Sequence, residues 1–294
     1  WYGMVVDHAV SRSVRDTALL LDLTHGADPL SPYAAREPKG AFTAAAARDP
    51  GRLSLAVYRK SPLGLPISAE TMEALDTAVA LAREGGHTVE EIDLPYIGRD
   101  FIADFCKSVA SAVAGMMRAE AKRVGRPVSG EVERATRVLG RLGEMLSAGE
   151  VYDAVQRLNA TARQMIEDTA RFDAVLMPII AHPPLACGAM DPKGADELVE
   201  NVLDKLHLTG LLRIKSFFGQ LMDKSLWFTP WPAIHNVSGQ PSIALPVHVT
   251  AGGLPLGIQA AGRPGDEETL LSLAAQMEKI SGWLKRRAPL KVPG

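Results

Sequence analysis

The chain has 294 residues, of which 47% are hydrophobic and 22% are charged, and its formal net charge is −2 at pH 7. A chain of this length and composition is globular and can bury roughly three quarters of its extended surface. The near-zero charge, without a basic stripe, argues against nucleic acid as a partner. The longest apolar runs, such as Val109–Met117, are much shorter than the roughly 20 residues of a membrane span, so no membrane segment is expected.

The chain contains two cysteines, Cys106 and Cys187. They stand in neither a CxxC nor a His-flanked zinc spacing, so we expect buried free thiols and no metal site. Free thiols favour a reducing compartment, and hence a cytoplasmic location. The chain opens at Trp1 without a basic segment followed by a long apolar one, so no signal peptide is expected.

The first third of the chain predicts a strand, helix and strand unit. Its predicted elements are a loop over Trp1–Ala9, a helix from Ser13 to Gly26, an irregular stretch over 29–49, a strand over Leu53–Tyr58, a helix over Ser68–Glu84 and a strand over His87–Leu94. Ser13 suits a helix N-cap, and Gly85 with Gly86 ends the longer helix. The short joints between the two strands and their helix imply a right-handed parallel crossover, and therefore an α/β sheet.

The middle of the chain predicts a helical flank and one more strand. Its predicted elements are helices over Asp100–Val124, Gly130–Leu146 and Gly149–Ala170, a strand over Phe172–Pro178, a Pro-rich loop over Ile179–Gly188 and one or two helices within Ala195–Ser225. Ser147 and Glu150 form a capping box for the third helix. Ligands of open α/β sheets lie outside the carboxyl ends of strands, so the Pro-rich loop is expected near a binding site.

The stretch Phe228–Glu278 alternates short apolar runs with glycine and proline. Its predicted elements are a helical turn over Pro232–Val237, a strand over Ser242–Val247, a turn over Ala251–Gly253, a strand over Leu254–Ala260 and a helix capped by Asp266. Gly239 suits a left-handed helix cap, and Pro241 cannot continue the helix. The first strand is almost wholly apolar, which predicts a central strand covered on both faces.

The same stretch carries an ordered pattern: Asn-x-x-Gly-x-Pro, an apolar strand that ends in Pro, Gly-Leu-Pro-x-Gly-x-Gln, and Gly-Arg-Pro-Gly-Asp-Glu before a Leu-rich helix. It is formed by Asn236, Gly239, Pro241, Pro246, Gly253, Leu254, Pro255, Gly257, Gln259 and residues 262–267. This pattern resembles the C-terminal core of the amidase signature family, the Ser-Ser-Lys amide hydrolases. The segment Ser11–Asp28 is similar to the helix that follows the family's catalytic segment, so the two resemblances keep the family's order. One departure is Met177 before Pro178, where the family often has threonine.

The resemblance implies an α/β fold, the C-terminal part of a single mixed-sheet amidase signature domain flanked by helices and covering residues 1–294. It implies an amidase that cleaves the C–N bond of a small-molecule carboxylic amide without a cofactor. The family's nucleophilic serine, relay serine and base lysine lie N-terminal to the segment that Ser11–Asp28 resembles. We therefore expect no catalytic residue in this chain, and no activity of the chain alone. A homodimer is left open.

Other catalytic motifs are missing from the sequence, including G-x-S-x-G, H-E-x-x-H, a P-loop and G-x-G-x-x-G. Ser238 and Ser242 stand beside Gly239 and are interpreted as helix-end and strand residues rather than nucleophiles. His182 and His235 lie in segments expected near the pocket. No second ligand or base stands at a suitable spacing, so both are interpreted as hydrogen-bonded structural histidines.

Two apolar segments are expected to form the walls of the substrate pocket. The predicted substrate-binding residues are Ile179, Ile180, Trp227, Phe228 and Trp231. Apolar walls with few polar groups are usual for a small-molecule site, although the same aromatic residues equally fit a core. The tail Ser281–Pro289, together with Trp231–Gln240, is similar to the branch of the family that contains 6-aminohexanoate cyclic dimer hydrolases.

Two other functions are weighed against an amidase. The first is a naturally shortened, non-catalytic binding or interaction subunit, to which the same lack of catalytic residues points. An α/β sheet cut through its middle would expose an edge and apolar surface, which argues against it. The second is a subunit that transfers an amide on charged tRNA, and it is disfavoured because nothing basic marks a surface for tRNA.

Overall fold

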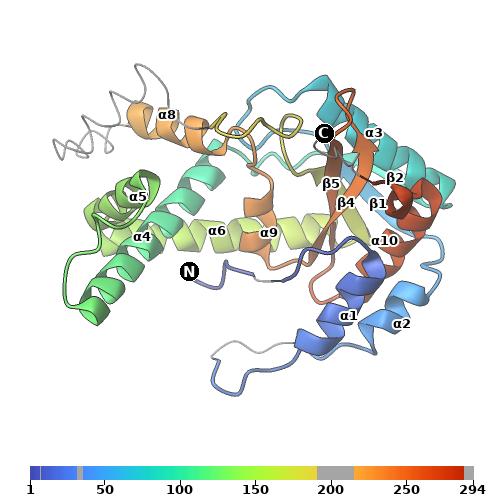
Figure 1. The fold of residues 1–294 in the computed structure, drawn as a ribbon, viewed down its shortest axis with the longest axis horizontal. Coiled ribbons are helices and arrows are strands. Elements are labelled where there is room, and N and C mark those ends of the chain that lie inside the picture. Colours follow the sequence, from blue (N-terminus) through green and yellow to red (C-terminus); the bar gives the residue numbers. More distant parts are fainter. Residues whose placement is uncertain (7, 32–35, 191–214, 288–294) are drawn as a thin grey trace, which may run out of the picture.

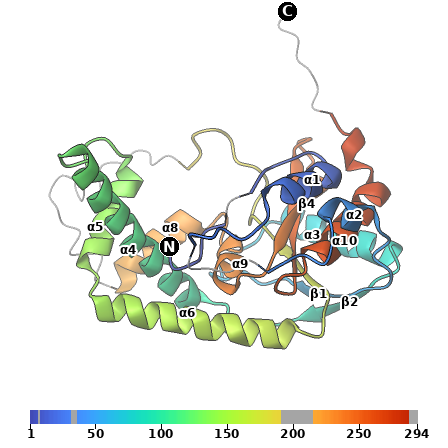
Figure 2. The same ribbon diagram turned by 90° about the horizontal axis from the view of Figure 1, so that it is seen from below.

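The computed structural model describes residues 1–6, 8–31, 36–190 and 215–287. Within them, one mixed β-sheet carries helices on both faces (Figures 1 and 2). The elements are α1 (Val14–Thr24), α2 (Phe42–Ala47), β1 (Ser54–Tyr58), α3 (Ala69–Glu84), β2 (Thr88–Ile92), α4 (Arg99–Val124), α5 (Arg134–Met145), α6 (Ala148–Thr169), β3 (Ala174–Pro178), α8 (Lys215–Leu226), α9 (Pro232–Ser238), β4 (Ser242–Val249), β5 (Pro255–Gly262), α10 (Glu267–Ser281) and a short 3₁₀ turn (Trp283–Lys285).

The strands follow the order β2-β1-β3-β5-β4 in the described sheet. β1 pairs in parallel with β2 and β3, whereas β5 runs antiparallel to both β3 and β4. The predicted parallel crossover and mixed sheet are confirmed. The prediction that the strand beginning at Ser242 is central is wrong, because β4 lies at an edge of the described sheet. Only Leu245 and Val247 of this strand are buried, while the small residues Ser242 and Ala244 face outward.

Successive residues of β3 feed two hydrophobic cores on opposite faces of the sheet. Leu176 lies in the first core, which α3 and α10 cover. Val175 and Met177 lie in the second core, which α4, α6 and α9 cover. In Figure 2, α6 runs as a long helix along one side of the molecule. Removal of apolar surface from water on both faces, at roughly 25 cal/mol per Å², is the main contribution that holds these layers together.

The stretch predicted to be irregular contains a helix, α2. The Asp22 carboxylate of α1 accepts hydrogen bonds from the Phe42 amide at 2.6 Å and from the Thr43 amide and hydroxyl at 3.0 and 2.6 Å. These bonds satisfy amides that a short helix leaves open at its start. The capping group comes from another helix, so a local sequence pattern does not show it. Of the one or two helices predicted within Ala195–Ser225, α8 is confirmed from Lys215 onward, and residues 195–214 lie outside the described residues.

The predicted helix-capping residues are found at the helix ends, with one change at Asp266. The Ser147 and Glu150 capping box is present, and Gly239 ends α9 with φ 67°. Asp266 occupies the N-cap position of α10, but its carboxylate accepts from the Thr269 hydroxyl at 2.8 Å rather than from a backbone amide. The start of α6 and the end of α9 therefore follow from the residues at those helix ends.

The two cysteines differ in exposure. Cys106 is half-buried in α4, where burial raises the pKa of its thiol to about 12. Cys187 is exposed, so the expectation that both thiols are buried is wrong for this residue. It lies in the Pro-rich loop after β3, which runs over the surface.

Gly257 of β5 faces an irregularity in β4, where the register shifts between Leu245 and His248. A Cβ atom at position 257 would lie 2.9 Å from the Leu245 carbonyl oxygen, and a backbone atom cannot swing away as a side-chain end can. We predict that Gly257→Ala lowers the free energy of unfolding by about 1 to 3 kcal/mol, measured by urea denaturation. The control is Gly40→Ala, where nothing lies within 4 Å of the added Cβ. Equal losses in both variants would contradict the close-approach argument.

Candidate functional site

The loops that leave β1 and β3 meet at one edge of the sheet. Because the two strands run parallel, the chain after Tyr58 and the chain after Pro178 leave in the same direction. The Ser68 amide donates a hydrogen bond to the Ala181 carbonyl at 2.9 Å and joins the two loops. The carboxyl ends of parallel strands are the usual ligand position in α/β sheets.

A third loop, between α8 and α9, joins the same edge. The Ala181 amide donates to the Phe228 carbonyl at 2.7 Å, and the Thr229 hydroxyl donates to the Ile179 carbonyl at 3.3 Å. The structure thus brings together the two segments that the sequence predicts as pocket walls, which lie about fifty residues apart. Residues 179–182 and 227–231 are referred to below as the edge loops.

Trp227 is packed between two other rings in the edge loops. Its ring centroid lies 5.2 Å from that of His182 and 5.7 Å from that of Phe228, both in edge-to-face arrangement. Such pairs contribute about 0.5 to 1.5 kcal/mol beyond burial, so the two neighbours hold the Trp227 ring in place. All three side chains, like that of Ile179, are half-buried and keep some exposed surface.

Trp231 occupies a more internal position than the other predicted contacts, and Ile180 contacts a hydrophobic core. Trp231 is 0% exposed within the second core, and its Nε1 donates to the Lys60 carbonyl at 3.1 Å. Ile180 is half-buried and packs against the first core. The geometry of Trp231 is that of a core residue that ties the edge loops to the loop after β1. Substrate contact by these two residues stays a prediction.

His235 of α9 is 4% exposed, and neither of its ring nitrogens has a hydrogen-bond partner within the described structure. Burial lowers its pKa to about 4, so the ring is neutral at pH 7. The interpretation of His235 as a hydrogen-bonded structural histidine is therefore corrected: it is buried, but its ring is not hydrogen-bonded to described residues. The sequence pattern contains no sign of this missing partner.

Asn236 has a positioning role that the sequence pattern does not reveal. Its Nδ2 donates to the carbonyl of Met4 at 2.9 Å, and the Met4 side chain is buried in the second core. This contact holds the first residues of the chain against α9. The only signal in the sequence is that Asn236 opens the Asn-x-x-Gly-x-Pro pattern.

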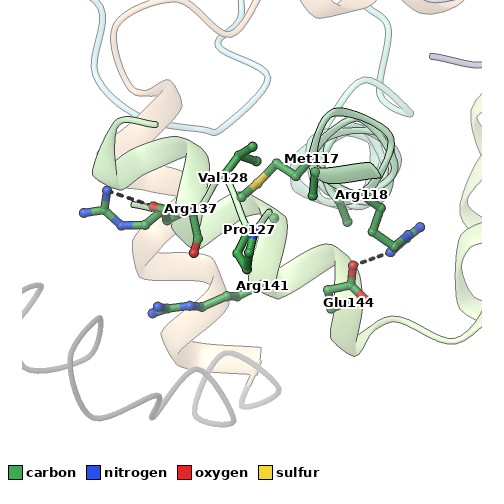
Figure 3. A pocket seen from close by; sticks show the side chains of 11 residues that line it. Met117, Arg118, Pro127, Val128, Arg137, Arg141 and Glu144 are labelled. Carbon is green, nitrogen blue, oxygen red and sulfur yellow. Dashed lines mark hydrogen bonds and ion pairs between the residues drawn. The ribbon is translucent and has the colours of Figure 1, made fainter. Parts of the chain in front are cut away.

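Two cavities formed by described residues lie away from the edge loops. One of about 200 Å³ lies between α4 and α5 beside Gly140 (Figure 3), and one of about 260 Å³ lies between α2 and the start of α10. None of the five predicted substrate-binding residues lines either of them. Across the described residues, no three His, Cys, Asp or Glu side chains are placed to hold a metal ion, and no helix is both long and apolar enough to span a membrane.

The chain is similar, along nearly its whole length, to proteins named as an amidase and as a hydrolase. The chain is 30% identical to AmiB2 of Mycobacterium tuberculosis, whose name describes an amidase, over 98% of this chain and 54% of that protein. It is 28% identical to the 6-aminohexanoate-cyclic-dimer hydrolase of Pseudomonas sp., over 99% of this chain and 57% of that protein. The chain therefore spans about half the length of the curated relatives it matches.

Comparison with solved structures leads to the same group of relatives. A solved structure of 6-aminohexanoate cyclic dimer hydrolase matches with a TM-score of 0.78 and 25% identity, over 94% of this chain and 55% of that one. A bacterial aryl acylamidase of the amidase signature family shares the fold, with a TM-score of 0.71 over 93% of this chain and 52% of that one. The Amidase family model matches residues 3–271. The chain belongs to the amidase signature family.

Proposed function

We propose that this chain forms a substrate-binding wall of an amide hydrolase, and that the edge loops contact the apolar part of a small neutral amide. The observation that carries the proposal is the Ala181 to Phe228 hydrogen bond, which joins the two apolar segments at the carboxyl edge of β1 and β3. Family membership supports hydrolysis of a C–N bond as the reaction. The name of one relative, a hydrolase of the 6-aminohexanoate cyclic dimer, supports a neutral amide as substrate.

We further propose that polypeptide outside these 294 residues supplies the nucleophilic serine, the relay serine and the base lysine. A lysine that acts as a base must be buried enough to lose its charge. Lys60, which follows β1 at this edge, instead has a side chain that is 66% exposed and paired with Asp93. Ser238 ends α9 and Ser242 begins β4, in line with structural roles.

The edge loops serve the proposed reaction by excluding water and orienting the amide. An apolar wall strengthens the electrostatic interactions of the groups that stabilise the developing oxyanion. Both cysteines are free in the structure, which supports the proposed cytoplasmic location. A homodimer stays a prediction.

The placement of the catalytic groups is tested with two proteins. One is the 294-residue chain, and the other is the product of the same reading frame extended upstream of Trp1. Each is incubated with the 6-aminohexanoate cyclic dimer, and the released amine is measured by chromatography. We expect hydrolysis by the extended product alone. Saturable hydrolysis by the shorter chain, free of host amidases, would contradict the placement, and no hydrolysis by either would favour a binding subunit.

The role of the edge loops is tested by binding. Trp227→Ala is expected to weaken binding of the cyclic dimer by about tenfold, because it removes the largest half-buried ring of the proposed wall. Tyr152→Ala is the control, since that side chain is exposed on α6. Both variants and the parent chain are compared by titration calorimetry. The same affinity in Trp227→Ala as in the parent would refute contact between this ring and the substrate.

A further inference from the structure

The cavity of about 260 Å³ between α2 and the start of α10 lies away from the edge loops. In both ribbon views, α2 lies beside α10 (Figures 1 and 2). The wall on the side of α2 is formed by small residues, Gly40, Ala41, Ala44 and Ala45. A Cβ atom added at Gly40 would have nothing within 4 Å. These small residues leave a space that the neighbouring helix does not fill.

Four charged residues line this cavity, two acidic and two basic. Lys39 and Asp266 pair with each other, with the Lys39 Nζ 3.6 Å from the Asp266 Oδ1. The other two, Glu268 and Arg48, form no ion pair with each other or with any other described residue. The lining is therefore neutral as a whole, but it holds one carboxylate and one guanidinium without a partner of opposite charge in the described part of the chain.

Glu268 differs from the other three charged residues because it is only 5% exposed. Its Oε1 accepts a hydrogen bond from the Lys39 backbone amide at 2.8 Å, whereas its Oε2 has no hydrogen-bond partner among the described residues. The positive end of the α10 dipole offsets only part of the cost of burying an unpaired carboxylate. A cationic group in the cavity would supply the missing partner.

Arg48 follows the last residue of α2, and its side chain is exposed. Its guanidinium has five N–H donors in a planar fork that matches a carboxylate in charge and geometry. An unpaired arginine is common on a protein surface, but this one lines the same cavity as the unpaired Glu268. A molecule that carries both an ammonium and a carboxylate can therefore contact both residues.

We propose that this cavity binds a linear amino carboxylate of about nine non-hydrogen atoms, with its ammonium at Glu268 and its carboxylate at Arg48. An apolar cavity of about 150 Å³ holds benzene, which has six such atoms, so a volume of about 260 Å³ suits a ligand of this size. An alkanoate would leave Glu268 unpaired, and an alkylammonium would leave Arg48 unpaired. Opening of a cyclic amide yields an amine and a carboxylate in one molecule, so the site suits this class of product; that role rests on the proposed function, whereas the binding itself does not.

The proposal is tested by titration calorimetry of 6-aminohexanoate, hexanoate and hexylamine into the full 294-residue chain. We expect saturable binding of 6-aminohexanoate and at least about tenfold weaker binding of each analogue, because each analogue lacks one charged contact. No saturable binding of 6-aminohexanoate, or equal affinity for either analogue, would overturn the proposal. The measurement involves no hydrolysis, so its result is independent of whether the chain belongs to an active amidase.

Charge variants locate the ligand within the chain. Glu268→Gln is expected to weaken binding by about tenfold, whereas Glu267→Gln, in the same helical turn but outside the cavity lining, should not change it. Arg48→Gln should also weaken binding by about tenfold, with the exposed Arg52→Gln as its matched control. Trp227→Ala should leave the affinity unchanged, and a loss in this variant would place the ligand at the edge loops instead.

A variant that fills the cavity tests the space itself. Ala44→Leu is expected to weaken binding of 6-aminohexanoate by at least about tenfold, whereas Ala47→Leu, on an exposed position of the same helix outside the lining, should not change it. Thermal unfolding checks the fold of each variant, and Arg48→Gln, at an exposed position, decides the outcome if Glu268→Gln does not fold. Unchanged affinity in folded Arg48→Gln or Ala44→Leu would refute binding in this cavity.

Discussion

Lowering the pH from about 7 to about 4 is expected to reduce the free energy of unfolding by about 3 kcal/mol through His235. Burial lowers the pKa of this histidine from 6.5 to about 4 in the folded state. Between these two values the unfolded chain binds more protons than the folded one, so stability falls as the pH falls. The loss begins as the pH drops through 6.5 and is complete below about 4. The physical cause is that protonation would place a charge in the second core beside no described hydrogen-bond partner.

The effect is measured by urea unfolding across this pH range in the parent chain and in His235→Leu. The variant should retain its stability at pH 7, because it removes two buried nitrogens that have no hydrogen-bond partner among the described residues, and it should lose less on acidification. Burial also lowers the pKa of His87, although its hydrogen bond to Gln276 opposes this. His87 is present in both proteins, so its contribution cancels in the comparison. Parallel pH profiles would show that His235 is not responsible.

Asp104→Ala is expected to lower the free energy of unfolding by about 2 to 4 kcal/mol. The Asp104 side chain is only 6% exposed and accepts two hydrogen bonds from Arg157 of α6, at 2.7 and 2.8 Å. Lys107 donates a third at 3.0 Å. These charge-assisted bonds join α4 to α6, and α6 in turn covers the second core. Because Arg157 and Lys107 are partly exposed, they can regain water, so the loss stays below that of a fully buried pair.

A matched control lies on the same helix. Glu120 also pairs with an arginine, Arg123, but both side chains are exposed, and Glu120→Ala should cost less than about 1 kcal/mol. A double-mutant cycle with Arg157→Ala isolates the coupling energy of the Asp104 pair. Equal losses for Asp104→Ala and Glu120→Ala in chemical unfolding would refute the importance of burial.

The contribution of the Asp104 carboxylate to stability also depends on pH. Burial alone raises the pKa of Asp104, but the hydrogen bonds and charges of Arg157 and Lys107 outweigh burial and hold the pKa below its ordinary value of 3.8. The stabilisation is therefore present above that value and is lost as the pH falls below it. This window lies mostly below that of His235, so the two contributions can be separated by pH.

Much of the secondary structure could be predicted from the sequence because its signals are local. The capping box of Ser147 and Glu150 starts α6, and Gly239 ends α9 in the left-handed conformation. The parallel pairing of β1 with β2 followed from two strands joined to one intervening helix by short connections. The glycine and proline pattern around Gly257 identified the family, and Gly257 itself is required by the close approach of β4.

The sequence could not predict features that depend on partners distant in the chain. The helix α2 begins where Asp22 of α1 caps it, and β4 lies at the edge rather than at the centre of the described sheet. The candidate site was predicted in part: its two segments meet as expected, but only packing showed that Trp231 is a core residue. The burial of His235 without a hydrogen-bond partner in the described part of the chain had no sequence signal, and neither had the cavity beside Gly140.

By itself, then, the sequence determined the family, the α/β class and most helix and strand positions, because caps, periodicity and backbone restrictions act within a few residues. The tertiary structure alone decided which side chains are desolvated, which charges are paired and which loops meet at the edge of β1 and β3. These properties arise when residues such as Ala181 and Phe228 come into contact across a long stretch of chain. Their energies depend on burial and geometry, which no local pattern specifies.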